Sequence, residues 1–415
     1  MSSKELRDYQ SEGAVVAAEC IKKYNIHYLC HSVRTGKTAT SLETAKQLNC
    51  KKVLFITKKK AIQSITDDYN DFGFNKYFEI VIINKESVQK YEDDYDLIIS
   101  DEHHSKISSF PKPPLLAKYL KAKYSKKPML FLSGTPWSES FSQAYHQFWV
   151  SDYSPWKEYK NFYSWSKEYV NVKQKRIGSF LCNDYTEGKE NKIMEDIIHL
   201  VSTRTQEQSG FTSKITEEIL YVQMKPITYE IANTLLRDRV FEGAKDIVLA
   251  DTAAKLMQKL HQVYSGTVKL ESGNSVILDT SKAEFIKEHF KGMKMALIYI
   301  FKEELSLLTQ VFGAENLTND IDEFNTTPKH FVGQVVSSRE GISLRSADVL
   351  IMYNIGHSNV SYLQARDRLT TIDRKENKVY FIFSKDGIEQ KIYKVVQSKD
   401  KYSSNIFKKD YNIKT

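Results

Sequence analysis

The chain has 415 residues, of which 41% are hydrophobic and 27% charged, a composition that excludes collagen-like, low-complexity and coiled-coil proteins. At roughly 150 residues per domain, this length predicts two or three domains. Lys and Arg total 60 against 52 Asp and Glu, and the charge of +8 is a weak indication of an anionic partner. Because no apolar run approaches the ~20 residues of a membrane span and the N-terminus lacks a secretory pattern, we expect a cytoplasmic protein.

The cysteines show neither CxxC pairing nor a histidine at zinc-finger spacing; they are Cys20, Cys30, Cys50 and Cys182. We therefore expect reduced thiols, without a disulfide framework or a structural metal site.

The first 135 residues alternate short apolar or β-branched runs with amphipathic stretches, a pattern typical of βα units and a mainly parallel sheet. The expected strands are His27–Cys30, Lys52–Thr57, Ile80–Ile83, Asp96–Ser100 and Met129–Ser133. A second series follows a helical stretch around Ile227–Tyr264 and contains the expected strands Met295–Phe301, Lys329–Val335, Val349–Tyr353 and Val379–Phe383. The sequence therefore predicts two α/β domains.

Residues 137–185 lie between these domains and hold all four tryptophans among many Tyr, Phe and Lys residues. The favoured interpretation is a set of helices whose aromatic faces pack on the first domain, and the alternative is a base-stacking surface for nucleic acid. Farther along, the run KLESGNSVI at residues 269–277 predicts a β-hairpin. Residues 401–415 form a basic tail with little periodicity.

The strongest local motif is Thr35-Gly36-Lys37-Thr38, which follows an expected strand and begins a helix. Such a loop offers backbone N–H groups to phosphate, the lysine reaches the β and γ phosphates, and the Thr38 hydroxyl can hold Mg²⁺. One part of the usual G-x-x-x-x-G-K-[ST] pattern differs, because His31 stands where the first glycine would fall.

Two adjacent carboxylates, Asp101 and Glu102, follow the apolar run at residues 97–100. They would project from the carboxyl end of a strand, where α/β sheets bind ligands. Asp101 is expected to hold Mg²⁺, often through water, and Glu102 to orient and deprotonate the attacking water. Of the two histidines that follow, His104 is expected to couple this site to the next motif.

Further residues fit the same site. In the run LRDYQ at residues 6–10, the Gln10 amide can pair with the edge of adenine, beside Arg7. Ser133 and Thr135, in SGTP after another strand, could relay the state of the nucleotide to nucleic acid.

With these motifs in this order, the chain resembles superfamily 2 helicases, specifically Swi/Snf-like ATPases of the compact bacteriophage type. Two later segments look like the family's fifth and sixth motifs: SREGISL at residues 338–344 and QARDR at residues 364–368. The resemblance implies two tandem RecA-like lobes, each a mainly parallel sheet flanked by helices, at residues 1–136 and 206–400. An aromatic-rich helical insertion, residues 137–205, would separate them, and the basic tail would follow.

Carried onto this chain, the resemblance implies that Lys37, Glu102 and Arg368 are catalytic. It also implies that three lysines after a strand end lie where the family contacts the DNA backbone, namely Lys58, Lys59 and Lys60; the alternative is an ordinary solvated loop. Gly341 and Arg368 would face ATP from the second lobe, together with Thr35, Gly36, Lys37 and Thr38 of the first, and Gln364 would belong to the coupling residues. One position departs from the family: Thr371 stands where a second arginine would reach the γ-phosphate. Arg366, Arg374 or Arg339 could substitute, or turnover could be slow.

The implied function is an ATP- and Mg²⁺-dependent DNA helicase or translocase that moves on duplex or branched DNA, in phage replication, recombination or repair. Two alternatives remain open. One is a nucleotide-gated DNA-binding or assembly protein with little ATP turnover, and the other is an RNA helicase. In a phage-encoded protein, the expected location is the host cytoplasm.

Overall fold

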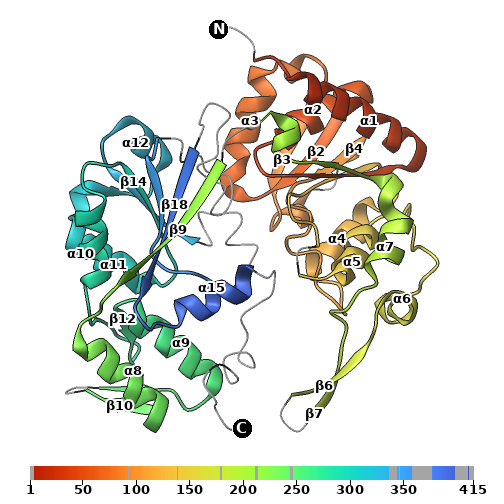
Figure 1. The fold of residues 1–415 in the computed structure, drawn as a ribbon. Helices are drawn as coiled ribbons and strands as arrows, with labels where there is room; N and C mark the ends of the chain where they lie inside the picture. The colour runs from red at the N-terminus through yellow and green to blue at the C-terminus, as the bar shows by residue number, and fades with distance from the viewer. Residues whose placement is uncertain are drawn as a thin grey trace. The chain divides into compact units, whose positions relative to one another are not determined.

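The computed structural model describes residues 4–91, 93–137, 139–177, 180–210, 214–243, 246–335, 344, 346–357, 376–397 and 410. The chain forms two compact units, Met1–Phe211 and Thr212–Thr415. Each unit contains a six-stranded parallel sheet flanked by helices, which establishes a mixed α/β fold (Figure 1). Within the described residues, every helix is too short or too polar to span a membrane.

The sheet of the first unit has the strand order β3-β2-β4-β5-β1-β8, and all its pairings are parallel. Its strands are β1 (Ile26–His31), β2 (Lys52–Thr57), β3 (Glu79–Asn84), β4 (Leu97–Ser100), β5 (Met129–Leu132) and β8 (Val201–Arg204). The five strands expected before residue 135 are confirmed, with shifts of at most a few residues at their ends. Since all strands run the same way, the loops after β1, β4 and β5 meet at one edge.

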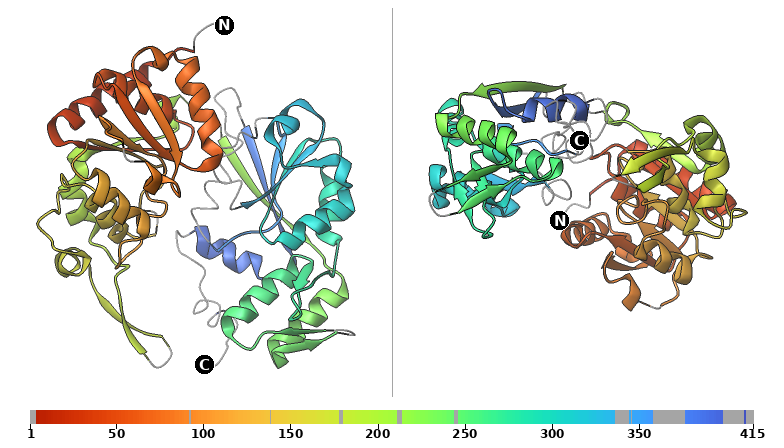
Figure 2. Two further views of the ribbon diagram at one scale, coloured as in Figure 1. Left: turned by 180° about the vertical axis from the view of Figure 1, so that it is seen from behind. Right: turned by 90° about the horizontal axis from the view of Figure 1, so that it is seen from below.

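Helices cover both faces of this sheet, as Figures 1 and 2 show. The helices are α1 (Asp8–Tyr24), α2 (Lys37–Gln47), α3 (Ile62–Asp71), α4 (Leu115–Tyr124), α5 (Ala144–Trp149), α6 (Phe162–Tyr169) and α7 (Glu190–Ile197). Alternate strand residues enter different cores: Leu29 and Phe55 pack with α1, α2 and α3, whereas Tyr28 and Leu54 pack with α4 to α7. This strict alternation explains why the strands read as continuous apolar runs.

The segment expected to be a helical insertion is only partly helical. It also forms an antiparallel hairpin, β6 (Lys173–Ile177) with β7 (Phe180–Asp184), which extends away from the sheet of the first unit (Figure 1). Its last strand, β8, pairs with β1 and so completes the first sheet. The packing interpretation of the aromatic residues is confirmed, because Trp156 and Trp165 are 2% and 0% exposed in the core beside α5 and α7.

The sheet of the second unit has the order β15-β16-β14-β17-β18-β9, again all parallel. Its strands are β9 (Lys214–Val222), β14 (Met295–Tyr299), β15 (Leu317–Thr318), β16 (His330–Gln334), β17 (Val349–Met352) and β18 (Glu376–Ser384). Helices α10 (Ser281–His289) and α11 (Lys302–Phe312) pack on one face. The other face carries α8 (Pro226–Asp238), α9 (Ala253–Tyr264), α12 (Ile321–Thr326) and α15 (Glu389–Gln397).

The helical stretch expected around Ile227–Tyr264 is confirmed in part, since it contains two helices, and the expected hairpin is confirmed. The stretch Ile227–Tyr264 is not one helix: Arg239 adopts a left-handed conformation (φ +66°) that ends α8, and the hairpin β10 (Val240–Glu242) and β11 (Ile247–Leu249) follows before α9. The hairpin expected at residues 269–277 forms from β12 (Thr267–Lys269) and β13 (Ser275–Ile277).

Candidate nucleotide-binding site

The GKT loop connects β1 to α2 at the carboxyl edge of the first sheet. Gly36 caps α2 in a left-handed conformation (φ +79°), so the first turn of the helix begins at Lys37. His31 is the last residue of β1, where an extended backbone needs no glycine. The departure from the usual glycine at this position therefore leaves the strand-loop-helix geometry in place.

Lys37 and Thr35 organise the loop from within. The Lys37 ammonium donates to the carbonyl oxygens of His31 and Ser32 at 2.9 and 3.0 Å. Thr35 is fully buried and its hydroxyl donates to the Ser32 carbonyl at 2.8 Å. The lysine thus lies across the loop that would hold phosphate, within reach of the negative charge it is expected to bind.

Gln10 lies directly against this loop. Its Oε1 accepts a hydrogen bond from the Arg7 N–H at 2.9 Å, and the side chain is 7% exposed. A Cβ atom at Gly36 would stand only 1.9 Å from Gln10 Nε2. The structure therefore places the residue expected to contact adenine, Gln10, beside the loop expected to bind phosphate. The Arg7 guanidinium is exposed and donates to the Tyr9 hydroxyl at 3.1 Å.

The acidic pair follows β4, separated from β1 in the sheet by β5 alone. Asp101 accepts from the Thr57 hydroxyl at 2.8 Å and from the Glu102 N–H at 2.9 Å. Burial and the neighbouring Glu102 carboxylate raise the Asp101 pKa, whereas the Thr57 hydrogen bond and the charges of Lys85 and Lys37 lower it.

The coupling residues lie beside the acidic pair. His104 Nδ1 is 2.7 Å from the Ser133 hydroxyl and 3.5 Å from Glu102 Oε2. The Ser133 hydroxyl in turn accepts from the Thr135 N–H at 3.0 Å. His104 therefore connects the carboxylate to the loop after β5, which is the placement expected of a coupling residue.

The loop after β5 also touches the GKT loop. A Cβ atom at Gly134 would lie 3.4 Å from a Val33 side-chain carbon and 3.5 Å from the His31 carbonyl oxygen. Residues 133–135 therefore lie directly beside the start of the GKT loop. Three of the expected motifs and the Gln10 amide thus form one continuous cluster.

His103 has a structural role. It is fully buried, stacks on Phe131 at a centroid distance of 3.7 Å, and contacts the Ser100 hydroxyl and the Gln147 carbonyl oxygen, each at 2.9 Å. Burial lowers its pKa to about 3, which keeps the ring neutral at physiological pH. The described residues contain no group of three or more His, Cys, Asp or Glu side chains placed to hold a metal.

The oxygen donors at the site fit Mg²⁺ held mainly by nucleotide phosphates. Magnesium characteristically takes one or two protein oxygens and completes its shell with water and phosphate, and Asp101 with the Thr38 hydroxyl offers that set. Glu102 Oε2 is buried and has no hydrogen-bond partner. A buried carboxylate oxygen in this state is suited to accept a proton from a bound water molecule.

Three residues at the site were not anticipated from the sequence. Arg204, at the end of β8, accepts the Ser32 N–H through its carbonyl at 2.8 Å and places its guanidinium 5.0 Å from the Tyr9 ring centre. Gln206 donates to the Val33 carbonyl at 3.0 Å. Lys85 donates to the Glu102 carbonyl at 2.6 Å. Arg204 and Gln206 lie in segments without a motif, and no role was predicted for the Lys85 side chain, so the tertiary fold identifies all three.

The other residues predicted for the site lie outside this cluster or outside the described part of the chain. Lys58, Lys59 and Lys60 follow β2 at the same sheet edge, and the last two are exposed. Several residues of the second half lie outside the described part of the chain; these are Gly341, Gln364, Arg368 and Thr371, and the possible substitutes Arg339, Arg366 and Arg374.

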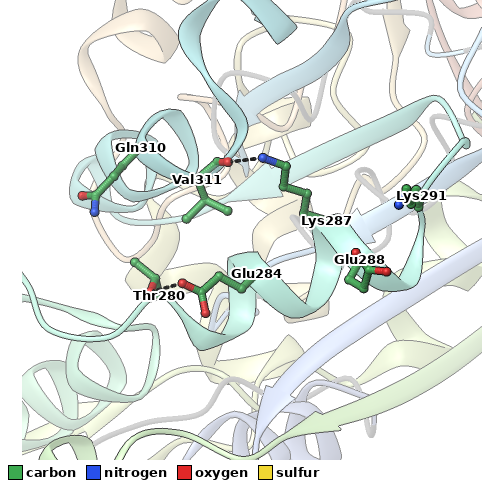
Figure 3. Close-up of a pocket in the computed structure, with 7 residues that line it drawn as sticks. All are labelled: Thr280, Glu284, Lys287, Glu288, Lys291, Gln310 and Val311. Carbon is green, nitrogen blue, oxygen red and sulfur yellow. Dashed lines mark hydrogen bonds between the residues drawn. The ribbon is translucent and has the colours of Figure 1, made fainter.

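A separate hollow of about 470 Å³ lies between α10 and α11 in the second unit (Figure 3). Two hydrogen bonds join residues that line it, from the Thr280 hydroxyl to Glu284 and from the Lys287 ammonium to the Val311 carbonyl. No expected site residue lines this hollow, and the Glu284 and Lys287 side chains already have these partners.

Comparison with known proteins yields little. No protein-family model matches the chain. A probable serine/threonine-protein kinase, pats1, from Dictyostelium discoideum is 32% identical to this chain over 80 residues, which are 18% of this chain and 2% of the relative. The chain thus spans a very small part of that relative's length, and a likeness of this extent does not show a shared family.

Proposed function

We propose that the chain is an ATP-dependent DNA helicase or translocase, and that its two parallel sheets are the RecA-like lobes of a Swi/Snf-like motor. The observation that carries the proposal is the convergence of the GKT loop, the acidic pair, the SGTP loop and Gln10 at one sheet edge. Any one of these motifs occurs often by chance, but their contact in space supports a single nucleotide site.

In this proposal, the N-terminus of α2 and the Lys37 ammonium bind the β and γ phosphates of ATP. Glu102 orients and deprotonates the attacking water through its buried Oε2, which makes no hydrogen bond to the protein. Mg²⁺, when bound, neutralises developing phosphate charge, and Thr38 and Asp101 are the residues that would hold it. Gln10 selects adenine.

The link to DNA rests on charge and on the relay of side chains beside the site. His104 and Ser133 would transmit loss of the γ-phosphate to the polymer path, and Lys58, Lys59 and Lys60 would contact a DNA backbone. Such contacts make binding independent of sequence and sensitive to salt. Phage replication, recombination or repair is the setting we propose.

Turnover is proposed to be slow but real. Thr371 replaces an arginine that can contribute a factor of about 10³ to 10⁵ in rate, whereas Arg368 is retained. Arg368→Ala should therefore abolish most of the remaining hydrolysis. An unchanged rate in this variant would remove Arg368 from the site.

The decisive experiment is steady-state ATP hydrolysis with no polymer, single-stranded DNA, duplex DNA, a branched junction or RNA. We expect stimulation by duplex or branched DNA that disappears in Lys37→Ala and Glu102→Gln. Lys46→Ala, at the far end of the same helix α2, is the matched control and should keep wild-type rates. Stimulation by RNA alone would indicate an RNA helicase, and tight ATP binding without turnover would indicate a nucleotide-gated binder.

The proposed binding of DNA by the lysines after β2 has its own test. Replacing Lys58, Lys59 and Lys60 together with Ala should reduce the slope of log affinity against log salt concentration by about 1 for each phosphate that these lysines neutralise. The matched control replaces three exposed lysines that precede strands at the opposite edge of the sheet, namely Lys22, Lys23 and Lys51. Equal slopes for both triple variants would exclude the proposed role of the lysines after β2.

A further inference from the structure

Lys85 is a buried lysine below the acidic turn. It follows β3, its N–H donates to the Thr57 carbonyl at 3.0 Å, and the residue is only 5% exposed. Its ammonium donates to the carbonyl oxygens of Glu102 at 2.6 Å and Ser105 at 3.2 Å. A lysine is rarely buried to this degree unless its charge has defined partners.

The turn that Lys85 holds has an unusual backbone. Glu102 adopts a left-handed conformation with φ +43°, which is sterically disfavoured for a residue with a Cβ atom. The carbonyl of Glu102 also accepts the Ser105 N–H at 2.8 Å. The Glu102 carbonyl oxygen therefore accepts two hydrogen bonds, one from Lys85 and one from Ser105. A strained backbone conformation persists only where several surrounding contacts fix it.

Charge supports the same arrangement. Burial lowers the Lys85 pKa to about 8, and the carboxylates of Asp101 and Glu102 act in the opposite direction. Lys58 lowers this pKa further and Glu86 raises it. At neutral pH the side chain is therefore an ammonium group, and it can donate to both carbonyl oxygens while it offsets the negative charge of the acidic pair.

We propose that Lys85 is a positioning residue for hydrolysis, which holds the Glu102 backbone in the conformation that directs its carboxylate toward the attacking water. This inference rests on the proposed ATPase activity. Lys85 does not touch the reacting atoms, since its contacts are to main-chain oxygens. Its removal should therefore affect the rate of the chemical step and leave nucleotide binding intact.

The test compares Lys85→Met, which keeps the length and apolar stem, with Lys85→Arg, which keeps the charge and the donors. DNA-stimulated kcat should fall about 10²-fold in Lys85→Met, in line with the effect of a misplaced catalytic group. KM for ATP and the affinity for a fluorescent ATP analogue should change less than twofold. Lys85→Arg should recover part of the rate, and a purely structural defect would lower binding as well as kcat.

The matched control is Lys106→Met, in the same turn. Lys106 also has a left-handed backbone, but its side chain is 58% exposed and pairs with Glu86 at the surface. This variant should keep kcat within twofold of wild type. A comparable decrease in both lysine variants would mean that the turn responds to any change of charge, which would overturn a specific role for Lys85.

A double variant separates action through Glu102 from an independent effect. Lys85→Met should cause no further decrease in the residual single-turnover rate of Glu102→Gln, because residues that act as a unit are strongly non-additive. Additive decreases, or an unchanged kcat in Lys85→Met, would refute the inference. If Lys85→Met does not fold, Lys85→Gln, which keeps an N–H donor, is measured for the same split between kcat and KM.

The outcome for the wild-type protein distinguishes the positioning role from the ATPase activity on which it rests. Turnover in the wild type together with a fully active Lys85→Met would refute the positioning role alone. No turnover in the wild type with any polymer would refute the proposed ATPase and the positioning role with it.

Discussion

Gly36 shows how one residue joins two parts of the proposed nucleotide site. Its left-handed backbone (φ +79°) begins α2, and its missing Cβ leaves room for the Gln10 amide. A methyl group at this position would overlap Gln10 Nε2, which would then have to move away from the loop. The glycine thus supports both the phosphate loop and the expected adenine contact.

We predict that Gly36→Ala raises the KM for ATP at least tenfold and weakens discrimination between ATP and GTP. The backbone conformation alone should cost about 1 kcal/mol of unfolding free energy, and the displaced Gln10 should account for the weaker nucleotide affinity. Steady-state hydrolysis with both nucleotides and urea unfolding measure the two effects separately.

Gly73→Ala is the control for this prediction. Gly73 has nearly the same left-handed backbone (φ +71°), but an added Cβ would meet only Lys76 Cε at 4.0 Å. We expect a similar decrease in stability and an unchanged KM. If both variants raised KM equally, the packing of Gln10 on Gly36 would have no role in binding.

Buried histidines are expected to make the first unit sensitive to acid, because burial lowers their pKa. His146 on α5 is 2% exposed, contacts the Ser109 carbonyl oxygen at 2.7 Å, and has a pKa that burial lowers to about 4. The unfolded chain binds this proton near pH 6.5, whereas the folded chain resists it until about pH 4. The contribution of the neutral His146 ring to the free energy of unfolding is therefore fully present above pH 6.5 and is lost as the pH drops toward 4.

For His146→Gln, we predict that the decrease in unfolding free energy between pH 7.5 and pH 5 is about 2 kcal/mol smaller than in the wild type. Urea unfolding at the two pH values, followed by tryptophan fluorescence, measures this difference. His199→Gln is the control, because His199 lies exposed at the surface and should leave the difference unchanged. A wild-type pH dependence in His146→Gln would show that other groups cause the acid sensitivity.

At the scale of the element, the short helix α6 is held by its aromatic side chains. Trp165 is fully buried and stacks on Tyr169 with a centroid distance of 5.0 Å and an angle of 4°. Tyr163 lies two positions earlier, which turns it to the opposite side of the helix, and it is 45% exposed. The helix thus has a packed aromatic side and a solvent-facing one.

We predict that Trp165→Ala lowers the unfolding free energy by about 3 to 5 kcal/mol, the range typical of large aromatic deletions in a core. Tyr163→Ala should lower it by less than about 1 kcal/mol. If residues 137–185 also stacked bases, exposed rings such as Tyr163 would contribute. Weaker DNA binding in Tyr163→Ala at unchanged stability would therefore restore the base-stacking interpretation for the exposed side.

Sequence patterns predicted the central strands well because those strands are buried on both faces. Lys52–Thr57 was expected with the bounds that β2 has. In contrast, β6 reads KQKRI and β8 reads VSTR, and neither short polar run shows an alternating apolar pattern. Strand β8 is identified only by its pairing with β1, which no local pattern encodes.

Some residues of the candidate site could likewise be predicted from the sequence, and others could not. Lys37, Asp101 and Glu102 belong to motifs whose chemistry can be inferred from residue type and spacing. No role at the site was predicted for Lys85 or Arg204, because both reach it through the order of strands in the sheet. The roles of Gly341, Gln364 and Arg368 stay predictions, because these residues lie outside the described part of the chain.

At the scale of the whole molecule, the two units have separate cores, each built on both faces of its own sheet. The second unit also contains a fully buried ion pair, with 3.1 Å between Lys282 Nζ and Glu389 Oε1 and both side chains 0% exposed. Tyr353 lies beside it, its ring centre 4.9 Å from the lysine nitrogen. Breaking one side of such a pair leaves a buried charge without a partner.

We predict that the chain unfolds in two calorimetric transitions, because domains with independent cores generally do not share one cooperative transition. Lys282→Met should lower the transition of the second unit by about 10 °C, since removal of one buried partner costs about 3 to 5 kcal/mol. It should not shift the transition that Trp165→Ala lowers. The double variant Lys282→Met with Glu389→Leu should regain most of the stability, because it removes both charges. If Lys282→Met and Trp165→Ala shifted one common transition equally, the two units would unfold as a single cooperative body, and separate cores would not imply separate stabilities.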